Sequence, residues 1–398
     1  MSSATRSRWA RAFVASGVCW LVGWQAAAVA GFPRRTTVTL GLYGFVLHVV
    51  FGKAYSLVPS YFDRDLAWDR APAAHLPLAT GGTAGLALSP LSGVPPLAGT
   101  VGALAWTGGF TIFLGTLAWT LRDNLSGGDT GTGDHNARRR PVDRIANLFV
   151  PVVLGYLAVG TWATLGTHTA VPVLLDGYPP RATHLLAAGG AALLVFAVGF
   201  RLLPRFLVAA VPSWVPGVVL PAGALGPALL AVGLPGGPLF RGGAVLEALA
   251  VVGFAVAYVW LYRTSERERV GFYGPLLGVG FGVLAVALGL TFAFGSLDPA
   301  LVSAHYRLNL LGFLGLTVVG VTYQFYPPTV GRFRGAGDDL AVAALGLIAG
   351  GLVIEVAGAG LAVAPAERAG PAVALVGTLA YAYLLLGVFL QRSGVIDP

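Results

Sequence analysis

Twelve apolar stretches, each about as long as a membrane-spanning helix, dominate this sequence of 398 residues. They fall at residues 12–30, 36–58, 73–90, 97–121, 145–168, 182–204, 207–233, 243–262, 270–295, 299–327, 339–362 and 369–391. A bilayer core of roughly 30 Å is crossed by about 20 apolar residues in a helix, which satisfies its own backbone hydrogen bonds there. The sequence therefore predicts an all-α polytopic membrane protein with 12 transmembrane helices in contact with a lipid bilayer. The third stretch is the least regular, because His75 and several prolines interrupt it.

The composition excludes a soluble protein. Hydrophobic residues make up 56% of the chain and charged residues only 11%, whereas soluble domains carry about 25% charged residues. The single cysteine, Cys19, excludes an intrachain disulfide and a Cys-x-x-Cys-His haem attachment.

Arginine placement predicts the orientation in the cell membrane. If the N-terminus, the C-terminus and every even-to-odd connection share one side, that side carries 18 arginines and the other carries five. Cytoplasmic loops are enriched in positive charge, so both termini are expected in the cytoplasm. The net charge of +8 follows from this topology and requires no nucleic-acid partner.

The first stretch resembles a signal peptide in one respect. It follows three arginines and ends in Ala-Val-Ala-Gly at residues 28–31, which resembles a cleavage site. Loss of this stretch would leave an odd number of helices and spoil the charge bias. We therefore expect it to be retained as the first helix.

Two polar breaks divide the chain into three groups of four helices. The longer break, residues 122–144, is rich in Gly, Asp, Thr and Arg and is typical of a flexible cytoplasmic linker. The shorter break spans residues 263–269. We expect a single membrane domain, 1–398, with pseudo-repeats at 1–132, 144–263 and 269–392.

A repeated signature supports these groups, because it recurs in the second helix of each. The first copy contains Gly44-Phe45, Gly52, Tyr55 and Pro59; the third contains Gly312-Phe313, Gly320, Tyr323 and Pro327 with the same spacing; the second is reduced to Gly189, Phe200 and Pro204. Such repeats indicate parallel units related by an axis along the membrane normal. Separately, the four-residue spacing of Gly346 and Gly350 predicts close helix contact.

Ionisable residues within the apolar stretches are the candidate functional residues, since each is costly inside a bilayer. They are His48, Lys53, His184, Glu247, His305, Arg307 and Glu355. At 1.5 Å of rise per residue, all except His48 and Lys53 lie in the outer third of their helices. We expect these five groups to meet in one outer cavity.

Each candidate has more than one interpretation. His184, His305 and His48 are either haem or metal ligands or buried imidazoles bonded to helix carbonyls. Arg307 either neutralises Glu247 or Glu355 or holds an anion such as a haem propionate. Lys53 either extends its amine towards the cytoplasmic interface or lies on a proton path.

Residues 303–328, from Ser-Ala-His-Tyr-Arg-Leu-Asn to Tyr-Gln-Phe-Tyr-Pro-Pro, resemble the tenth helix of catalytic subunit I of the haem–copper oxidases. That family has twelve helices, cytoplasmic termini and a threefold pseudo-repeat. Its tenth helix carries His-x-His near the outer end, with the first His on the high-spin haem and the second on the low-spin haem. The resemblance gives His305 the first position.

Other family ligands are missing. The second position is Arg307, which stays protonated and cannot bind iron. Thr37 and Thr39 stand where the second helix carries a low-spin ligand, and the seventh helix lacks the copper-binding His pair. Oxygen reduction is therefore not expected. The twelve-helix NnrS-like membrane proteins, which are linked to haem, copper and nitric-oxide tolerance, are similar in plan.

The resemblance implies a membrane protein that binds one haem or metal through His305 and His184, with Arg307 beside the cofactor. Haem is the cofactor expected, and copper is the less favoured alternative. Its role would be in respiration, nitric-oxide response or haem and metal handling, with a respiratory-chain or haem-protein partner. The alternative is a secondary transporter with a buried site made of Glu247, Arg307 and Glu355.

Overall fold

The computed structural model describes residues 3–393, with side chains from residue 7 onward. Over this range the chain is helical, without strands. Eleven helical segments are long and apolar enough to cross a membrane. The first half contains α1 (Ser3–Val29), α2 (Arg34–Thr39), η1 (Leu40–Val46), α3 (Leu47–Tyr61), α4 (Ala71–Leu88), α5 (Leu97–Leu121), η2 (Asp134–Arg139), α6 (Arg140–Leu148), α7 (Val150–Gly166), α8 (Pro179–His184), η3 (Leu185–Ala192) and α9 (Leu193–Phe206). The second half contains α10 (Trp214–Gly233), α11 (Pro238–Thr264), η4 (Val270–Phe272), α12 (Tyr273–Phe294), α13 (Pro299–Arg307), η5 (Leu308–Gly315), α14 (Leu316–Phe325), η6 (Pro328–Val330), α15 (Asp338–Gly360) and α16 (Ala364–Arg392).

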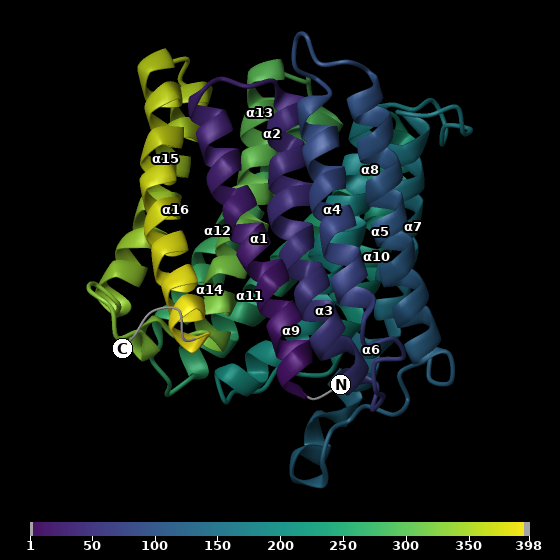
Figure 1. Ribbon diagram of the computed structural model, residues 1–398, viewed down its shortest axis with the longest axis vertical. Coiled ribbons are helices and arrows are strands. Elements are labelled where there is room, and N and C mark those ends of the chain that lie inside the picture. The colour runs from purple at the N-terminus through teal and green to yellow at the C-terminus, as the bar shows by residue number, and fades with distance from the viewer. Residues whose placement is uncertain (1–2, 394–398) are drawn as a thin grey trace.

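The all-helical fold confirms the prediction from the apolar stretches. The stretch at 97–121 coincides with α5, and most other stretches differ from their helices by a few residues at each end. The third stretch forms α4, which packs mainly against α5 (Figure 1) but is not among the eleven candidate spans. His75, Pro77 and several small residues account for its lower hydropathy.

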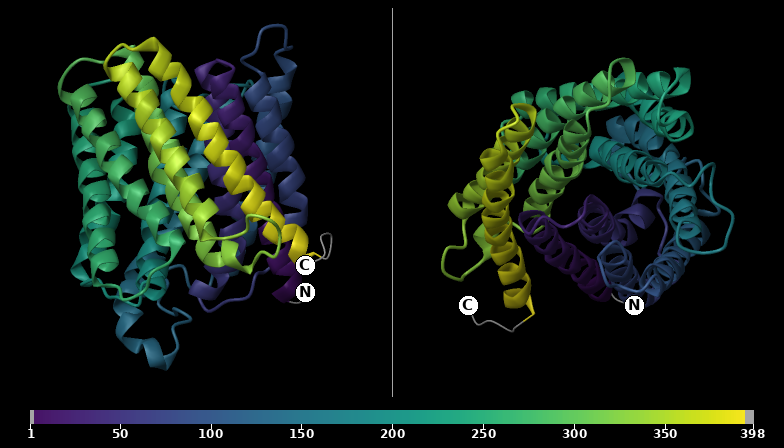
Figure 2. Two further views of the ribbon diagram at one scale, coloured as in Figure 1. Left: turned by 90° about the vertical axis from the view of Figure 1, so that its left-hand side faces the viewer. Right: turned by 90° about the horizontal axis from the view of Figure 1, so that it is seen from above.

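Three helices form an inner layer and the others surround them. The inner helices are the segments Arg34–Tyr61, Pro179–Phe206 and Pro299–Val330, in which 83%, 72% and 78% of the span is buried, against 50% or less in every other candidate span. These are the three helices that carry the repeated signature. The outer helices form a closed ring, because the last helix, α16, packs against the first, α1 (Figure 2).

Each inner helix contains a π-helical stretch at the same distance from its proline. The stretches η1, η3 and η5 begin at Leu40, Leu185 and Leu308, each 19 residues before Pro59, Pro204 or Pro327. A π stretch carries one extra residue per turn and often marks a functional site. The three stretches touch one another at the centre of the molecule.

Both ends of the described chain lie on one face of the bundle, which we call the terminal face (Figure 1). The opposite face is the distal face. The linker 122–144 lies at the terminal face and packs onto the helices there. Asn124 donates to the carbonyl of Phe62 at 3.0 Å, and Arg201 donates to the carbonyl of Thr130 at 2.8 Å. The linker is thus bonded to the bundle in both directions, because its Asn124 amide donates to a carbonyl at the end of α3 and Arg201 of α9 donates to a linker carbonyl.

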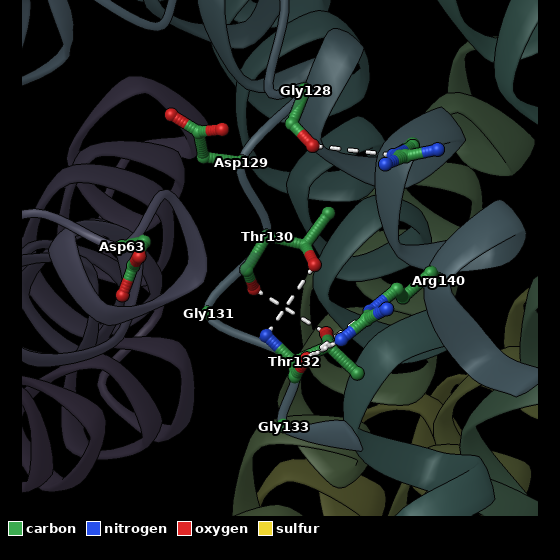
Figure 3. Close-up of a pocket in the computed structure, with 9 residues that line it drawn as sticks. Asp63, Gly128, Asp129, Thr130, Gly131, Thr132, Gly133 and Arg140 are labelled. Carbon is green, nitrogen blue, oxygen red and sulfur yellow. Dashed lines mark hydrogen bonds between the residues drawn. The ribbon is translucent and has the colours of Figure 1, made fainter. Parts of the chain in front are cut away.

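The linker and Asp63 also line an open polar pocket of about 400 Å³ (Figure 3). Arg144 donates to the carbonyl of Gly128 at 3.2 Å, and Arg140 donates to that of Thr132 at 3.3 Å. Both arginines thus form hydrogen bonds within the linker.

Close helix contacts fall at glycines other than Gly346 and Gly350. A Cβ added at either of these two would meet nothing within 4 Å, so the predicted contact is wrong. The next glycine, Gly351, is the one that faces α16, where an added Cβ would lie 2.5 Å from the Ala374 nitrogen. The four-residue spacing alone does not say which side of a helix faces a neighbour.

Candidate functional site

Two histidines occupy the distal half of neighbouring inner helices. His184 ends α8 immediately before η3, and His305 lies in α13 three residues before η5 begins. Their helices are neighbours, because η3 and η5, which follow the two histidines along the chain, contact each other. Both keep some accessible surface, as does Asn309 one turn beyond His305.

Backbone carbonyls fix the orientation of both imidazoles. Nδ1 of His184 lies 2.8 Å from the Pro180 carbonyl, and Nδ1 of His305 lies 3.1 Å from the Ala285 carbonyl. A carbonyl only accepts, so Nδ1 carries the proton in each ring and Nε2 keeps its lone pair. Histidines that bind metals through Nε2 typically donate from Nδ1 to a carbonyl or carboxylate in this way.

The surroundings of His305 are aromatic and amide groups. The ring of Phe292 stands edge-on with centroids 5.7 Å apart. Nδ2 of Asn309 lies 3.3 Å from His305 Nε2, but its shorter bond, 2.8 Å, goes to the His305 carbonyl. Asn309 therefore makes only a long contact with the nitrogen that a metal would use.

Arg307 points to a different part of the bundle. Its Nη2 lies 2.8 Å from Oε2 of Glu355 on α15, and the same nitrogen donates to Oε1 of Gln25 on α1 at 2.9 Å. The guanidinium carbon lies 5.0 Å from the Trp24 ring centroid, and only 1% of the Arg307 side chain is exposed. Of the two partners predicted for Arg307, the structure selects Glu355.

Glu247 lies in neither cluster. It is buried in α11 against α10, where a Cβ added to Gly226 would lie 2.7 Å from Oε1. In the described part of the chain this oxygen has no hydrogen-bond partner. The expectation that all five outer groups meet in one cavity is therefore wrong. The five groups lie at a similar depth but face different neighbours. Arg307 on α13 pairs with Glu355 on α15, whereas Glu247 on α11 packs against α10 and the two histidines lie elsewhere on α8 and α13.

The remaining candidates lie nearer the terminal face. His48 is fully buried, with Nδ1 2.8 Å from the Tyr43 carbonyl and Nε2 3.2 Å from Thr80 Oγ1. Both of its nitrogens are occupied, as in a satisfied core histidine. Lys53 donates to the Tyr326 hydroxyl at 3.1 Å, at the end of α14.

Sequence reasoning missed two amides that complete these clusters, Gln25 and Asn309. Each is an uncharged polar residue within an apolar stretch, and Asn309 stands four residues after His305, on the same helical face. These positions in the sequence could have identified both amides as candidate site residues.

The two Nε2 atoms that keep a lone pair are the candidate ligands that this region offers to a metal ion or a haem iron. Among the residues that the structure describes, no group of three or more His, Cys, Asp or Glu side chains is placed to hold a metal. Comparison with models of known protein families gives no match, and neither does comparison with curated proteins.

Proposed function

We propose that this chain is a multi-pass cell-membrane protein built on the plan of haem–copper oxidase subunit I, and that it binds a single haem or metal ion through His184 and His305. In this proposal twelve helices form three repeats of four, with both termini in the cytoplasm. Its role lies in respiration, nitric-oxide response or haem and metal handling, together with a respiratory-chain or haem-protein partner.

The architecture supports the proposal through the inner helices. All three begin a π stretch 19 residues before a proline, as Leu40 and Pro59 illustrate. Three helices with one local distortion at one position favour a threefold internal repeat. The arginine-rich linker and both termini share the terminal face (Figure 1), in keeping with positive-inside orientation.

The main evidence for the proposed binding site is the orientation of His184 and His305. Each ring donates from Nδ1 to a carbonyl and leaves a lone pair on Nε2, and the two rings lie on adjacent inner helices. In this proposal the two Nε2 atoms would hold one haem iron or one metal ion. A bound haem or copper would supply one-electron transfer or binding of a diatomic gas.

The rest of the oxidase ligand set does not fit. Arg307 and Glu355 fill the position where the family carries its second tenth-helix histidine. The proposal therefore includes no binuclear centre and no oxygen reduction.

The test is to measure the haem and metal content of the purified protein. After expression with ample haem precursor, we expect about one haem or metal per chain, measured by reduced-minus-oxidised spectra and elemental analysis. His184→Ala and His305→Ala should abolish or shift the signal. His135→Ala, on the exposed linker, is the matched control and should leave it unchanged. A haem-free and metal-free protein would refute the proposal, as would unaltered spectra in both site variants.

One observation favours a second candidate, a proton-coupled transporter. Glu247 is a buried carboxyl with an oxygen that lacks a partner, and such groups carry protons in many transporters. Glu247→Gln should then abolish solute uptake in vesicles while any bound chromophore is unaffected. Arg307 and Glu355 take no part in this version, because they neutralise each other.

A further inference from the structure

The open polar pocket on the terminal face has charged groups of both signs in its wall. Its volume of about 400 Å³ is typical of a small-molecule site. Asp63 and Asp129 lie on one side of the loop backbone, and Arg140 lies on the other (Figure 3). Arg144 also lines the pocket and stands four residues after Arg140, on the same face of α6. The wall thus offers carboxylates on one side and guanidinium groups on the other.

One charge on each side lacks a partner of opposite sign. None of the ion pairs between described residues includes Asp63 or Arg144. The other two lining charges pair with residues outside the pocket, as Asp129 does with Arg64 at 3.1 Å. Arg144 donates to the Gly128 carbonyl from Nε, and this bond does not use its two terminal nitrogens. The pocket therefore presents one uncompensated carboxylate and one uncompensated guanidinium group.

The loop between the two sides is fixed against the helix bundle. Gly131 has a φ of +55°, and a Cβ at this position would clash with the Ser60 carbonyl oxygen at the end of α3. The neighbouring carbonyl, that of Thr130, accepts the bond from Arg201 of α9 at 2.8 Å. Asp63 itself has a φ of +53°, a left-handed backbone that aspartate adopts more readily than most residues. The backbone thus holds the two charged sides in place, so the pocket is preformed.

We propose that this pocket binds a small zwitterion, the phosphoethanolamine group, with its phosphate on Arg140 and Arg144 and its ammonium on Asp63. Guanidinium groups match the oxygens of a phosphate, and an ammonium supplies donors to a carboxylate. A simple anion would also face Asp63 and Asp129, and a simple cation would face the two arginines, so a molecule that carries both charges is favoured. Phosphoethanolamine occurs free and as the head group of phosphatidylethanolamine. The site is separate from the histidine site, which lies in the distal half.

The test uses full-length protein in nanodiscs of phosphatidylcholine, titrated with O-phosphoethanolamine in a calorimeter. We expect saturable binding of about one molecule per chain. Arg144→Gln and Asp63→Asn should each weaken it about tenfold or more, since a charge-assisted hydrogen bond is lost. Asparagine also tolerates the left-handed backbone of Asp63, so the loop should keep its shape. Inorganic phosphate, the second probe, should bind more weakly than phosphoethanolamine. Its affinity should fall in Arg144→Gln but not in Asp63→Asn.

The controls are Arg138→Gln and Asp123→Asn, which alter exposed linker charges outside the pocket and should bind like the wild type. Gly131→Ala, which displaces the loop, should reduce binding without altering any charge. Nanodiscs of phosphatidylethanolamine distinguish the two sources. A lower affinity for the free probe there assigns the pocket to the lipid head group, and an unchanged affinity assigns it to the free molecule.

Three results would overturn the proposal. One is the absence of saturable binding of O-phosphoethanolamine in nanodiscs of either lipid. Another is wild-type affinity in either Arg144→Gln or Asp63→Asn. The third is equal affinity for inorganic phosphate and phosphoethanolamine, which would show that the ammonium makes no contact.

Discussion

Arg307 on α13 reaches Oε2 of Glu355 on α15 through two nitrogens, with Nε at 2.9 Å and Nη2 at 2.8 Å. Gln25 on α1 accepts a third bond from the same guanidinium. One buried side chain therefore ties an inner helix to two outer ones. Because the pair is internally neutral, it needs no external anion, and its first consequence is for stability.

Arg307→Met should strongly destabilise the protein. It leaves Glu355 with an unpaired charge in a mostly buried place, and breaking one side of a buried ion pair costs about 3–5 kcal/mol. Thermal unfolding in detergent, followed by size-exclusion chromatography, measures the loss. The double variant Arg307→Met with Glu355→Met should recover much of it, since no charge remains buried alone.

An exposed pair provides the control. Arg64 and Asp129 lie 3.1 Å apart, with 27% and 63% of their side chains exposed. Surface pairs contribute about 0–1 kcal/mol, so Arg64→Met should barely alter the unfolding temperature. Equal losses in Arg64→Met and Arg307→Met would contradict the assigned role of Arg307.

Substitution at Gly320 should disrupt the packing of α14 on α12. An added Cβ would lie 2.5 Å from Pro275 Cδ and 2.6 Å from the Gly271 carbonyl oxygen. Gly320→Ala therefore forces the two helices apart, and overpacking typically costs about 1–3 kcal/mol. Gly346→Ala, which meets nothing within 4 Å, should instead be neutral or stabilising by up to about 1 kcal/mol through helix propensity. The ratio of folded yields at increasing temperature distinguishes the two.

Asp143→Asn should release the linker from the terminal face. Asp143 is 1% exposed, lies 2.7 Å from Arg205, and accepts a bond from Thr132 at 2.6 Å. Asparagine keeps one acceptor oxygen but loses the negative charge and the second oxygen, so it cannot accept from Thr132 and from both Arg205 nitrogens as the carboxylate does. We expect faster limited proteolysis within 122–144. Asp134→Asn is the control, because the Asp134 side chain is 98% exposed. A cleavage rate that rises equally in both variants would argue against a clamp at Asp143.

The sequence was sufficient for the helices because an apolar stretch of helical length has few alternatives in a bilayer. The shared signature marked the three helices that the structure places in the inner layer, although it did not predict their burial, and the sequence named both His184 and His305. It did not predict which polar groups meet. Depth along a helix follows from residue number, but the side that faces a neighbour depends on packing, as Gly346 and Gly351 illustrate. Glu247 and Glu355 were equal candidates for Arg307 for the same reason. The π stretches left no signal beyond the repeat itself, because they arise from the packing of the inner helices.

The two buried glutamates should respond in opposite directions to replacement by methionine, a flexible apolar side chain of similar length. Glu355→Met removes the partner of Arg307 and should destabilise by about 3–5 kcal/mol. Glu247→Met removes a carboxyl whose Oε1 lacks a hydrogen-bond partner, and an unsatisfied buried group costs about 1–3 kcal/mol, so the unfolding temperature should rise. A fall of similar size in both variants would mean that Glu247 has a partner of its own. A rise in stability together with loss of solute uptake would instead mark Glu247 as a functional group kept at the expense of stability.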